Sequence, residues 1–231
     1  MSDGWTGINI GEVKNNLNEF KDGMESAREL YFNSLIAFNV VLYRGWASER
    51  AVEFNTRLEK LAELNRTIRN YTEEMLHNAQ MAGFYMAASN GANFDYDYFM
   101  NIIDTNYKPL AEEQDGVKGM NIPLVKDASV TFMANVGKVN AQLAAIPYNI
   151  ALIDPSGELQ AIYEEKVKKL AGDITEQLLY VVDELNEAFE QEELQLQMGK
   201  AQAEDALGGG ASEGINILND IMQEQQKHIY N

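Results

Sequence analysis

The sequence contains no cysteine, and only two of its 231 residues are histidine. The absence of cysteine excludes disulfide bonds, thiolate catalysis and cysteine-based zinc sites. The scarcity of histidine leaves His77 as the only suitable base for a nucleophilic triad. We therefore expect a protein that is not an enzyme and that needs no metal or other cofactor.

Positive charge is also scarce. The chain has 18 lysines and arginines and 36 aspartates and glutamates, which gives a net charge of −18. Such a field repels phosphate backbones and anionic lipid surfaces, so nucleic acid is not an expected partner. No apolar run is long enough to span a membrane, and residues 1–11 lack the pattern of a conventional secretory signal. The chain is expected either in the cytoplasm before export or outside the cell, reached by a route independent of a signal peptide.

The composition, with 45% hydrophobic and 10% aromatic residues, is ordinary for a folded protein. Apolar residues recur at three- and four-residue spacings on both sides of the run 43–46, which predicts two helices joined by a short bend. The first stripe comprises Val13, Leu17, Phe20, Met24, Ala27, Tyr31, Leu35, Phe38 and Leu42, and the second includes Ala51, Phe54, Leu58, Leu61, Ile68, Met75, Ala79 and Met86. Together they form an antiparallel helical hairpin.

The second half of the sequence repeats this plan. Residues 9–14 are echoed by residues 121–126 at an offset of 112, and the bend recurs at an offset of 109. At the second bend Pro155, Gly157 and Tyr163 stand in the places of Trp46, Ser48 and Phe54. The two offsets would agree if the first helix of the second hairpin were three residues shorter than the first helix of the first hairpin. The shared order of these matches indicates an internal duplication.

The sequence therefore predicts an all-α fold of two antiparallel helical hairpins in tandem, packed as an elongated four-helix bundle with a short C-terminal helix. The predicted parts are a first hairpin (1–88), an aromatic connector (89–119), a second, degenerate hairpin (120–200) and a glycine-rich break with a short amphipathic helix (201–231). The connector is expected to pack on the bundle and to hold a short helix near residues 98–105.

The predicted terminal helix has one apolar face, formed by Ile215, Leu218, Ile221 and Met222. Two interpretations stay open for it. The helix either folds back onto the bundle or acts as a detachable segment that a partner recognises.

The opening run Ile8-Asn9-Ile10-Gly11-Glu12-Val13, with Trp46 at the bend, a small residue two places later and Phe54 eight places later, resembles the WXG100 (ESAT-6-like) family. The members of this family are small helical hairpins exported by type VII secretion. The resemblance covers residues 8–88 and, more weakly, 120–195. Neither copy carries the whole signature, because Ser48 replaces the family's glycine in the first and Pro155 replaces its tryptophan in the second.

The resemblance implies a non-enzymatic protein of a bacterial type VII secretion system, acting as a secreted effector or as a carrier or chaperone through its helix faces. Family members pair as dimers of hairpins, so a tandem chain is expected to be a monomeric pseudo-dimer or a homodimer. The implied partners are the secretion ATPase and a related WXG100 or LXG protein, since the chain also has a weaker likeness to the N-terminal domains of LXG toxins.

The resemblance implies recognition residues at both bends: Trp46, Ser48, Phe54, Pro155, Gly157 and Tyr163. Trp46 is also interpreted as a buried residue that closes the end of the bundle, and the two roles are compatible. A secretion signal of the form Tyr-x-x-x-Asp/Glu is matched by Tyr180 and Glu184, although these lie inside the expected fourth helix. Their alternative role is core packing and an i,i+4 surface contact.

Other functions are kept as alternatives. One is a cytoplasmic helical adaptor without an export role. Another is a helical metal-binding oxidase, because Glu74 and His77 form a Glu-x-x-His step, but His228 supplies no second step of this kind. A pore-forming toxin lacks support because the sequence has no long apolar hairpin.

Overall fold

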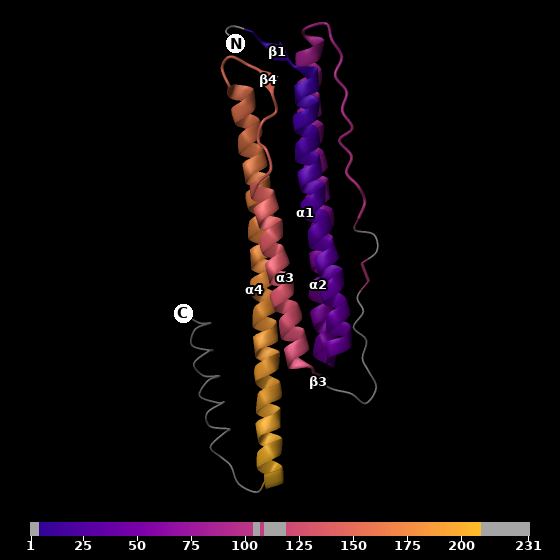
Figure 1. The fold of residues 1–231 in the computed structure, drawn as a ribbon, viewed down its shortest axis with the longest axis vertical. Helices are drawn as coiled ribbons and strands as arrows, with labels where there is room; N and C mark the ends of the chain where they lie inside the picture. Colours follow the sequence, from indigo (N-terminus) through magenta and orange to yellow (C-terminus); the bar gives the residue numbers. More distant parts are fainter. Residues whose placement is uncertain (1–4, 104–106, 109–118, 209–231) are drawn as a thin grey trace. The chain divides into compact units, whose positions relative to one another are not determined.

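The computed structural model describes residues 5–103, 107–108 and 119–208 of the chain (Figure 1). Within these residues lie four helices: α1 (Ile10–Gly45), α2 (Glu49–Ala88), α3 (Ile122–Ala144) and α4 (Glu158–Gly208). Four two-residue strands accompany them: β1 (Gly7–Ile8), β2 (Trp46–Ala47), β3 (Gly119–Met120) and β4 (Leu152–Ile153). The predicted all-α fold is confirmed, while the predicted short terminal helix lies outside the described residues.

The chain divides into two compact units, Met1–Val182 and Asp183–Asn231. The first unit contains α1, α2, α3, the strands and residues 158–182 of α4. The described part of the second unit, residues 183–208, is helical throughout, and its buried residues are Leu185 and Glu192. In the part of the chain that the structure describes, no helix combines the length and apolar character needed to cross a bilayer.

Helix α1 is the centre of the first unit, since it packs against both α2 and α3. Its start is fixed by Asn9, whose side chain accepts a hydrogen bond from the backbone N–H of Glu12 at 3.2 Å. Its apolar stripe is buried, as the periodicity predicted: Val13, Leu17, Phe20, Met24, Ala27, Tyr31, Leu35, Phe38 and Leu42. The ring of Phe38 stacks on Phe132 of α3, with centroids 5.0 Å apart. These buried aromatic side chains form much of the apolar core.

The short strand before each hairpin pairs with a strand at the bend of the other hairpin, and these pairs hold the two hairpins together. Strand β1 precedes α1 but pairs with β4, at the bend between α3 and α4. Strand β3 precedes α3 but pairs with β2, at the bend between α1 and α2. Both pairs are antiparallel. Each hairpin therefore begins at the bend of the other.

Helix α3, with 23 residues, is thirteen residues shorter than the 36-residue α1, so the predicted shortening by three residues is wrong. The physical reason is the stretch 145–151, which leaves the helix before reaching β4 (Figure 1). A residue outside a helix can advance farther than the roughly 1.5 Å of a helical residue, so the shorter α3 and the stretch that follows it need fewer residues in total than α1 contains.

The connector between the hairpins runs back along α1 and α2 in its described parts, residues 89–103 and 107–108 (Figure 1). The Lys21 ammonium donates to the backbone carbonyl of Asp97 at 3.1 Å, and the buried Arg28 donates to that of Asn101 at 3.2 Å. The connector also buries three of its own side chains: Phe94, Tyr96 and Met100. It therefore packs on the first hairpin.

The expected short helix near residues 98–105 is wrong for residues 98–103, which are neither helix nor strand, and residues 104–105 lie outside the described part. The backbone N–H of Met100 donates to the carboxylate of Glu73 at 3.0 Å, and that of Asn101 donates to Glu25 at 2.8 Å. Because these carboxylates on α1 and α2 take the donors that a helix needs, tertiary contacts override the local helical pattern.

Candidate recognition site

The first bend is narrow and buried. Trp46, with only 4% of its surface exposed, pairs with Met120, and the N–H of Asn121 donates to the carbonyl of Gly45 at 2.6 Å. A Cβ atom added at Gly45 would lie 3.1 Å from a methyl group of Val125 on α3. A small residue is therefore favoured at Gly45, where α1 lies against side chains of α3.

The backbone conformation of Ser48 explains why the first bend needs no glycine at this position. Its backbone is extended, with φ of −169°, a conformation that any residue adopts. Its hydroxyl accepts a hydrogen bond from the N–H of Ala51 at 3.2 Å and so caps the start of α2. The rings of Trp46 and Phe54 pack with centroids 5.3 Å apart, and Phe54 is 3% exposed. The three predicted residues of the first bend thus lie together.

The second bend is exposed and depends on turn chemistry. Gly157 has φ of +71°, a left-handed conformation that favours glycine, and Pro155 is exposed beside it. The carboxylate of Asp154 accepts hydrogen bonds from the backbone N–H of Leu159 at 3.1 Å and of Ser156 at 3.0 Å. These bonds, with that from Leu159 the strongest, hold the pKa of Asp154 below its usual range.

The strand register identifies a different counterpart of Trp46. Trp46 pairs with Met120, and the equivalent pair at the second bend joins Leu152 to Ile8. Leu152 therefore replaces Pro155 as the residue in the tryptophan position. One residue separates β2 from α2, whereas four separate β4 from α4. The offset of 109 aligns the starts of these two helices, but three additional residues displace Pro155 from the strand.

Tyr163 occupies the position on α4 that Phe54 occupies on α2, and it is also buried, with 7% of its surface exposed. Its ring meets Phe20 of α1 edge-on, with centroids 6.4 Å apart. Burial raises the pKa of Tyr163 well above its usual range, so its hydroxyl stays protonated. Its role is to pack α4 onto α1.

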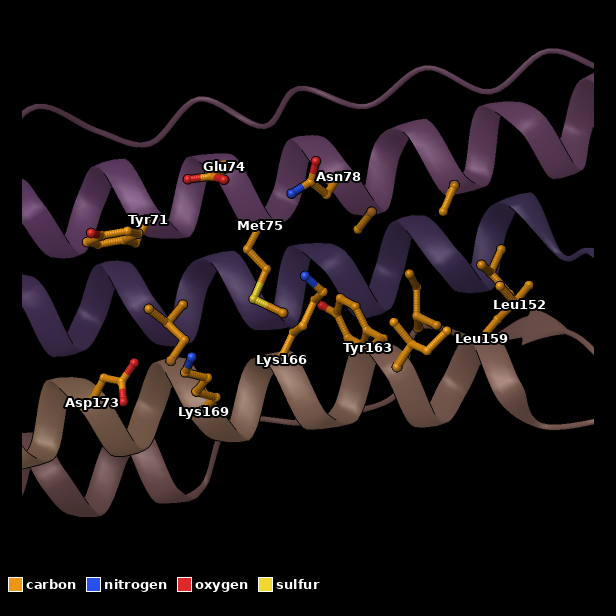
Figure 2. A pocket seen from close by; sticks show the side chains of 15 residues that line it. Tyr71, Glu74, Met75, Asn78, Leu152, Leu159, Tyr163, Lys166, Lys169 and Asp173 are labelled. Atoms are coloured by element: carbon orange, nitrogen blue, oxygen red, sulfur yellow. The ribbon is translucent and has the colours of Figure 1, made fainter.

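A groove of about 460 Å³ lies between α2 and α4, and residues next to the second bend close one end of it (Figure 2). Apolar side chains from both helices and the bend line it, including Met75, Ala79, Leu152, Leu159, Ile162 and Leu170. Figure 2 shows Leu152 and Leu159 at one end and Tyr71 with Asp173 at the other. This volume is in the usual range of binding pockets, and the lining has the expected excess of apolar groups.

The rims of the groove combine exposed apolar surface with both signs of charge. Ile162 is 52% exposed and Tyr71 is 58% exposed. Glu74 and Asp173 contribute carboxylates, while Lys166 and Lys169 contribute ammonium groups. An amphipathic helix, with an apolar stripe between charged flanks, has the matching chemistry.

Tyr180 and Glu184 lie within α4, four residues apart, and both are exposed. Tyr180 has 60% of its surface exposed, so its predicted alternative role as a core residue is wrong. The pair lies on one helix face, and its role as a secretion signal stays a prediction.

Glu74 and His77 have different neighbours. Glu74 lines the groove, whereas the ring of His77 packs on Tyr98 of the connector, with centroids 4.7 Å apart. Over residues 5–103, 107–108 and 119–208, no group of three or more histidine, aspartate or glutamate side chains could hold a metal ion. His228 lies outside these ranges.

Sequence reasoning missed the groove and the strand pairs. A signal for the strands was present, since the run Gly-x-Asn-Ile occurs before both α1 and α3. The groove had no comparable signal, because its lining combines residues from α2 with residues about 70 to 100 positions later.

No protein-family model, no curated protein and no solved structure matches the chain. The likeness to the WXG100 family therefore rests on the motif residues at the bends.

Proposed function

We propose that the chain is a non-enzymatic, WXG100-like protein of a bacterial type VII secretion system. It acts as a secreted effector or as a carrier or chaperone, and it recognises protein partners through its helix faces. The expected partners are the secretion ATPase and a related WXG100 or LXG protein. Trp46 and Phe54 at the first bend and Gly157 at the second, each next to a helical hairpin, support this proposal.

The observation that carries a recognition role is the groove between α2 and α4. Its apolar lining, its exposed Ile162 and its rim of both charges suit the helix-in-groove mode of protein binding. Within the groove, the exposed part of Ile162 adds to the apolar area that a bound helix could contact.

Export is tested by comparing the amount of the chain in cells and in culture medium, with and without the gene for the secretion ATPase. The proposal expects the chain in the medium only when the ATPase is present. Retention in the cells under both conditions contradicts export and favours the alternative, a cytoplasmic adaptor that uses the same groove.

Recognition by the groove is tested with Ile162→Asp and its matched control Val130→Asp. Both residues are apolar and about half-exposed, at 52% and 56%, but only Ile162 lines the groove. Ile162→Asp is expected to weaken binding of the partner roughly tenfold, because it places a charge in the apolar lining, while Val130→Asp leaves binding unchanged. Equal effects of the two substitutions on binding, measured by titration calorimetry, rule out the groove as the recognition surface.

A further inference from the structure

The groove between α2 and α4 has an uncharged end and a charged end. Among the described residues that line it, those next to the second bend are uncharged and mostly apolar, with Ala79, Ala82, Leu152, Leu159 and Ile162 among them. From its middle to the end at Tyr71, the groove carries its four charged side chains (Figure 2). These are Glu74 on α2 and Lys166, Lys169 and Asp173 on α4.

The four charged groups are available to a ligand. All of them are exposed, and within the described part of the chain none of their side chains makes a hydrogen bond or an ion pair. Two are carboxylates and two are ammonium groups, so their charges sum to zero. A partner that meets these groups with opposite charges must therefore carry both signs at this end of the groove.

The dimensions of the groove suit a short stretch of one helix. The lining residues of α4 extend from Leu159 to Asp173, an advance of roughly 21 Å at about 1.5 Å per residue. Since a cavity of about 150 Å³ holds one benzene ring, the 460 Å³ of this groove hold roughly three ring-sized side chains. Apolar residues at positions i, i+4 and i+7 of a partner helix supply three such side chains on one face.

Building on the recognition function proposed above, we propose that the groove binds its partner helix preferentially in one direction. The partner helix has an apolar face along its length, no charge in the half that lies next to Leu152 and Leu159, and residues of both signs in the half that lies at Glu74 and Asp173. In the reverse direction, those charged residues would lie against the uncharged, apolar end of the groove, where no opposite charge meets them.

The mismatch in the reverse direction is the larger of the two electrostatic effects. An exposed ion pair contributes little to binding, whereas a charge placed without a partner in an apolar site costs much more. The direction is therefore selected mainly against the wrong arrangement. We expect binding in the reverse direction to be about tenfold weaker.

Two synthetic peptides of equal composition test the direction. Each is an amphipathic helix of about 15 residues, with leucine at the heptad positions a and d and a cysteine at its N-terminus. The first peptide has lysine and glutamate, in equal numbers, only in its N-terminal half, and the second has them only in its C-terminal half. Because the chain itself contains no cysteine, Ala82→Cys marks the uncharged end of the groove and Tyr71→Cys marks the charged end.

Mixed disulfides between each peptide and each full-length variant are measured on a non-reducing gel. The first peptide should favour Tyr71→Cys and the second Ala82→Cys, so the ratio of labelling at the two ends should differ roughly tenfold between the peptides. A matched control removes the four charges of the groove in each cysteine variant, and there the two peptides should give the same ratio. Its substitutions are Glu74→Gln, Lys166→Gln, Lys169→Gln and Asp173→Asn.

The substitution Ile162→Asp separates the direction of binding from the recognition function itself. Equal ratios for the two peptides, with labelling that Ile162→Asp abolishes, overturn the preferred direction and leave the groove as the recognition surface. Labelling that Ile162→Asp does not reduce overturns both proposals. A difference between the peptides that persists after the four charges are removed also overturns the proposed direction, because another feature then selects it. Circular dichroism checks that each variant is folded.

Discussion

The two bends of the first unit hold equivalent strand pairs and differ in how the chain passes from the strand into the next helix. At the first bend, the single residue Ser48 separates β2 from α2, and the strand itself carries the buried Trp46. At the second bend, residues 154–157 separate β4 from α4 and are largely exposed. The first bend is stabilised by apolar burial and the second by hydrogen bonds within a turn.

This difference gives Trp46 and Gly157 separate roles at the two bends. The aromatic residue closes the end of a hairpin, as Trp46 does against Phe54. The glycine permits a left-handed backbone, as Gly157 does at φ of +71°. Ser48, with an extended backbone, has no need for glycine and supplies a helix cap instead. Each bend carries the residue that its own geometry requires.

The largest expected effect is a difference between the two bends in how much a substitution lowers the free energy of unfolding. Trp46→Ala should lower the free energy of unfolding by about 3–5 kcal/mol, because it empties a buried aromatic site. Pro155→Ala, at the position aligned with Trp46 by sequence, should change it by less than about 1 kcal/mol, since the ring is exposed. Urea denaturation followed by circular dichroism measures both. Similar losses for the two variants contradict the contrast between a buried and an exposed bend.

A smaller effect tests the equivalence of the two helix starts. Asn9→Ala and Asn121→Ala should each lower the free energy of unfolding by about 1 kcal/mol, because each removes a side-chain acceptor that caps a helix. Asn9→Asp and Asn121→Asp keep the acceptor and serve as controls in the same denaturation experiment. A loss at only one of the two positions would show that the repeated run has different roles in the two hairpins.

The smallest effect concerns pH. The pKa of Asp154 is lowered by hydrogen bonds from Leu159 and Ser156, so its carboxylate stabilises the turn above its unfolded pKa of about 3.9. This contribution is lost as the pH falls through the lower, folded pKa. The hydroxyl of Ser48 does not titrate, so the first bend should keep its cap over the same range.

An NMR titration of the Asp154 carboxyl carbon, together with the amide signals of Leu159 and Ala51, measures this difference. The Leu159 amide should shift with the titration of Asp154, and the Ala51 amide should not follow it. Ser156→Ala should move the pKa of Asp154 upward because it removes the hydroxyl donor to that carboxylate. A wild-type pKa at or above about 3.9 would exclude the proposed turn stabilisation.

Much of the fold could be predicted because its signals are local. Spacings of three and four residues placed the buried stripe from Val13 to Leu42 on one face of α1. Phe54 and Tyr163, which the sequence implied only as recognition residues, are both buried near the starts of α2 and α4. The short helix in the connector failed because Glu25 and Glu73, more than 25 positions away, accept the backbone donors of that segment.

The candidate site was less predictable than the fold. The residues around Trp46 could be found because they are close together in the sequence. The groove could not, because it brings Met75 and Ala79 of α2 opposite Ile162 of α4. The sequence of either helix alone does not show whether its apolar stripe is covered by another helix or left open to a partner.

The sequence by itself determined the helical period and the two bends, because each depends on residues close together along the chain. Only the tertiary structure decided that each hairpin begins at the bend of the other, that Leu152 is the counterpart of Trp46, and that α2 and α4 leave a groove. These features are pairings between residues about 70 to 150 positions apart, and no local pattern specifies which strand or helix face becomes the neighbour of another.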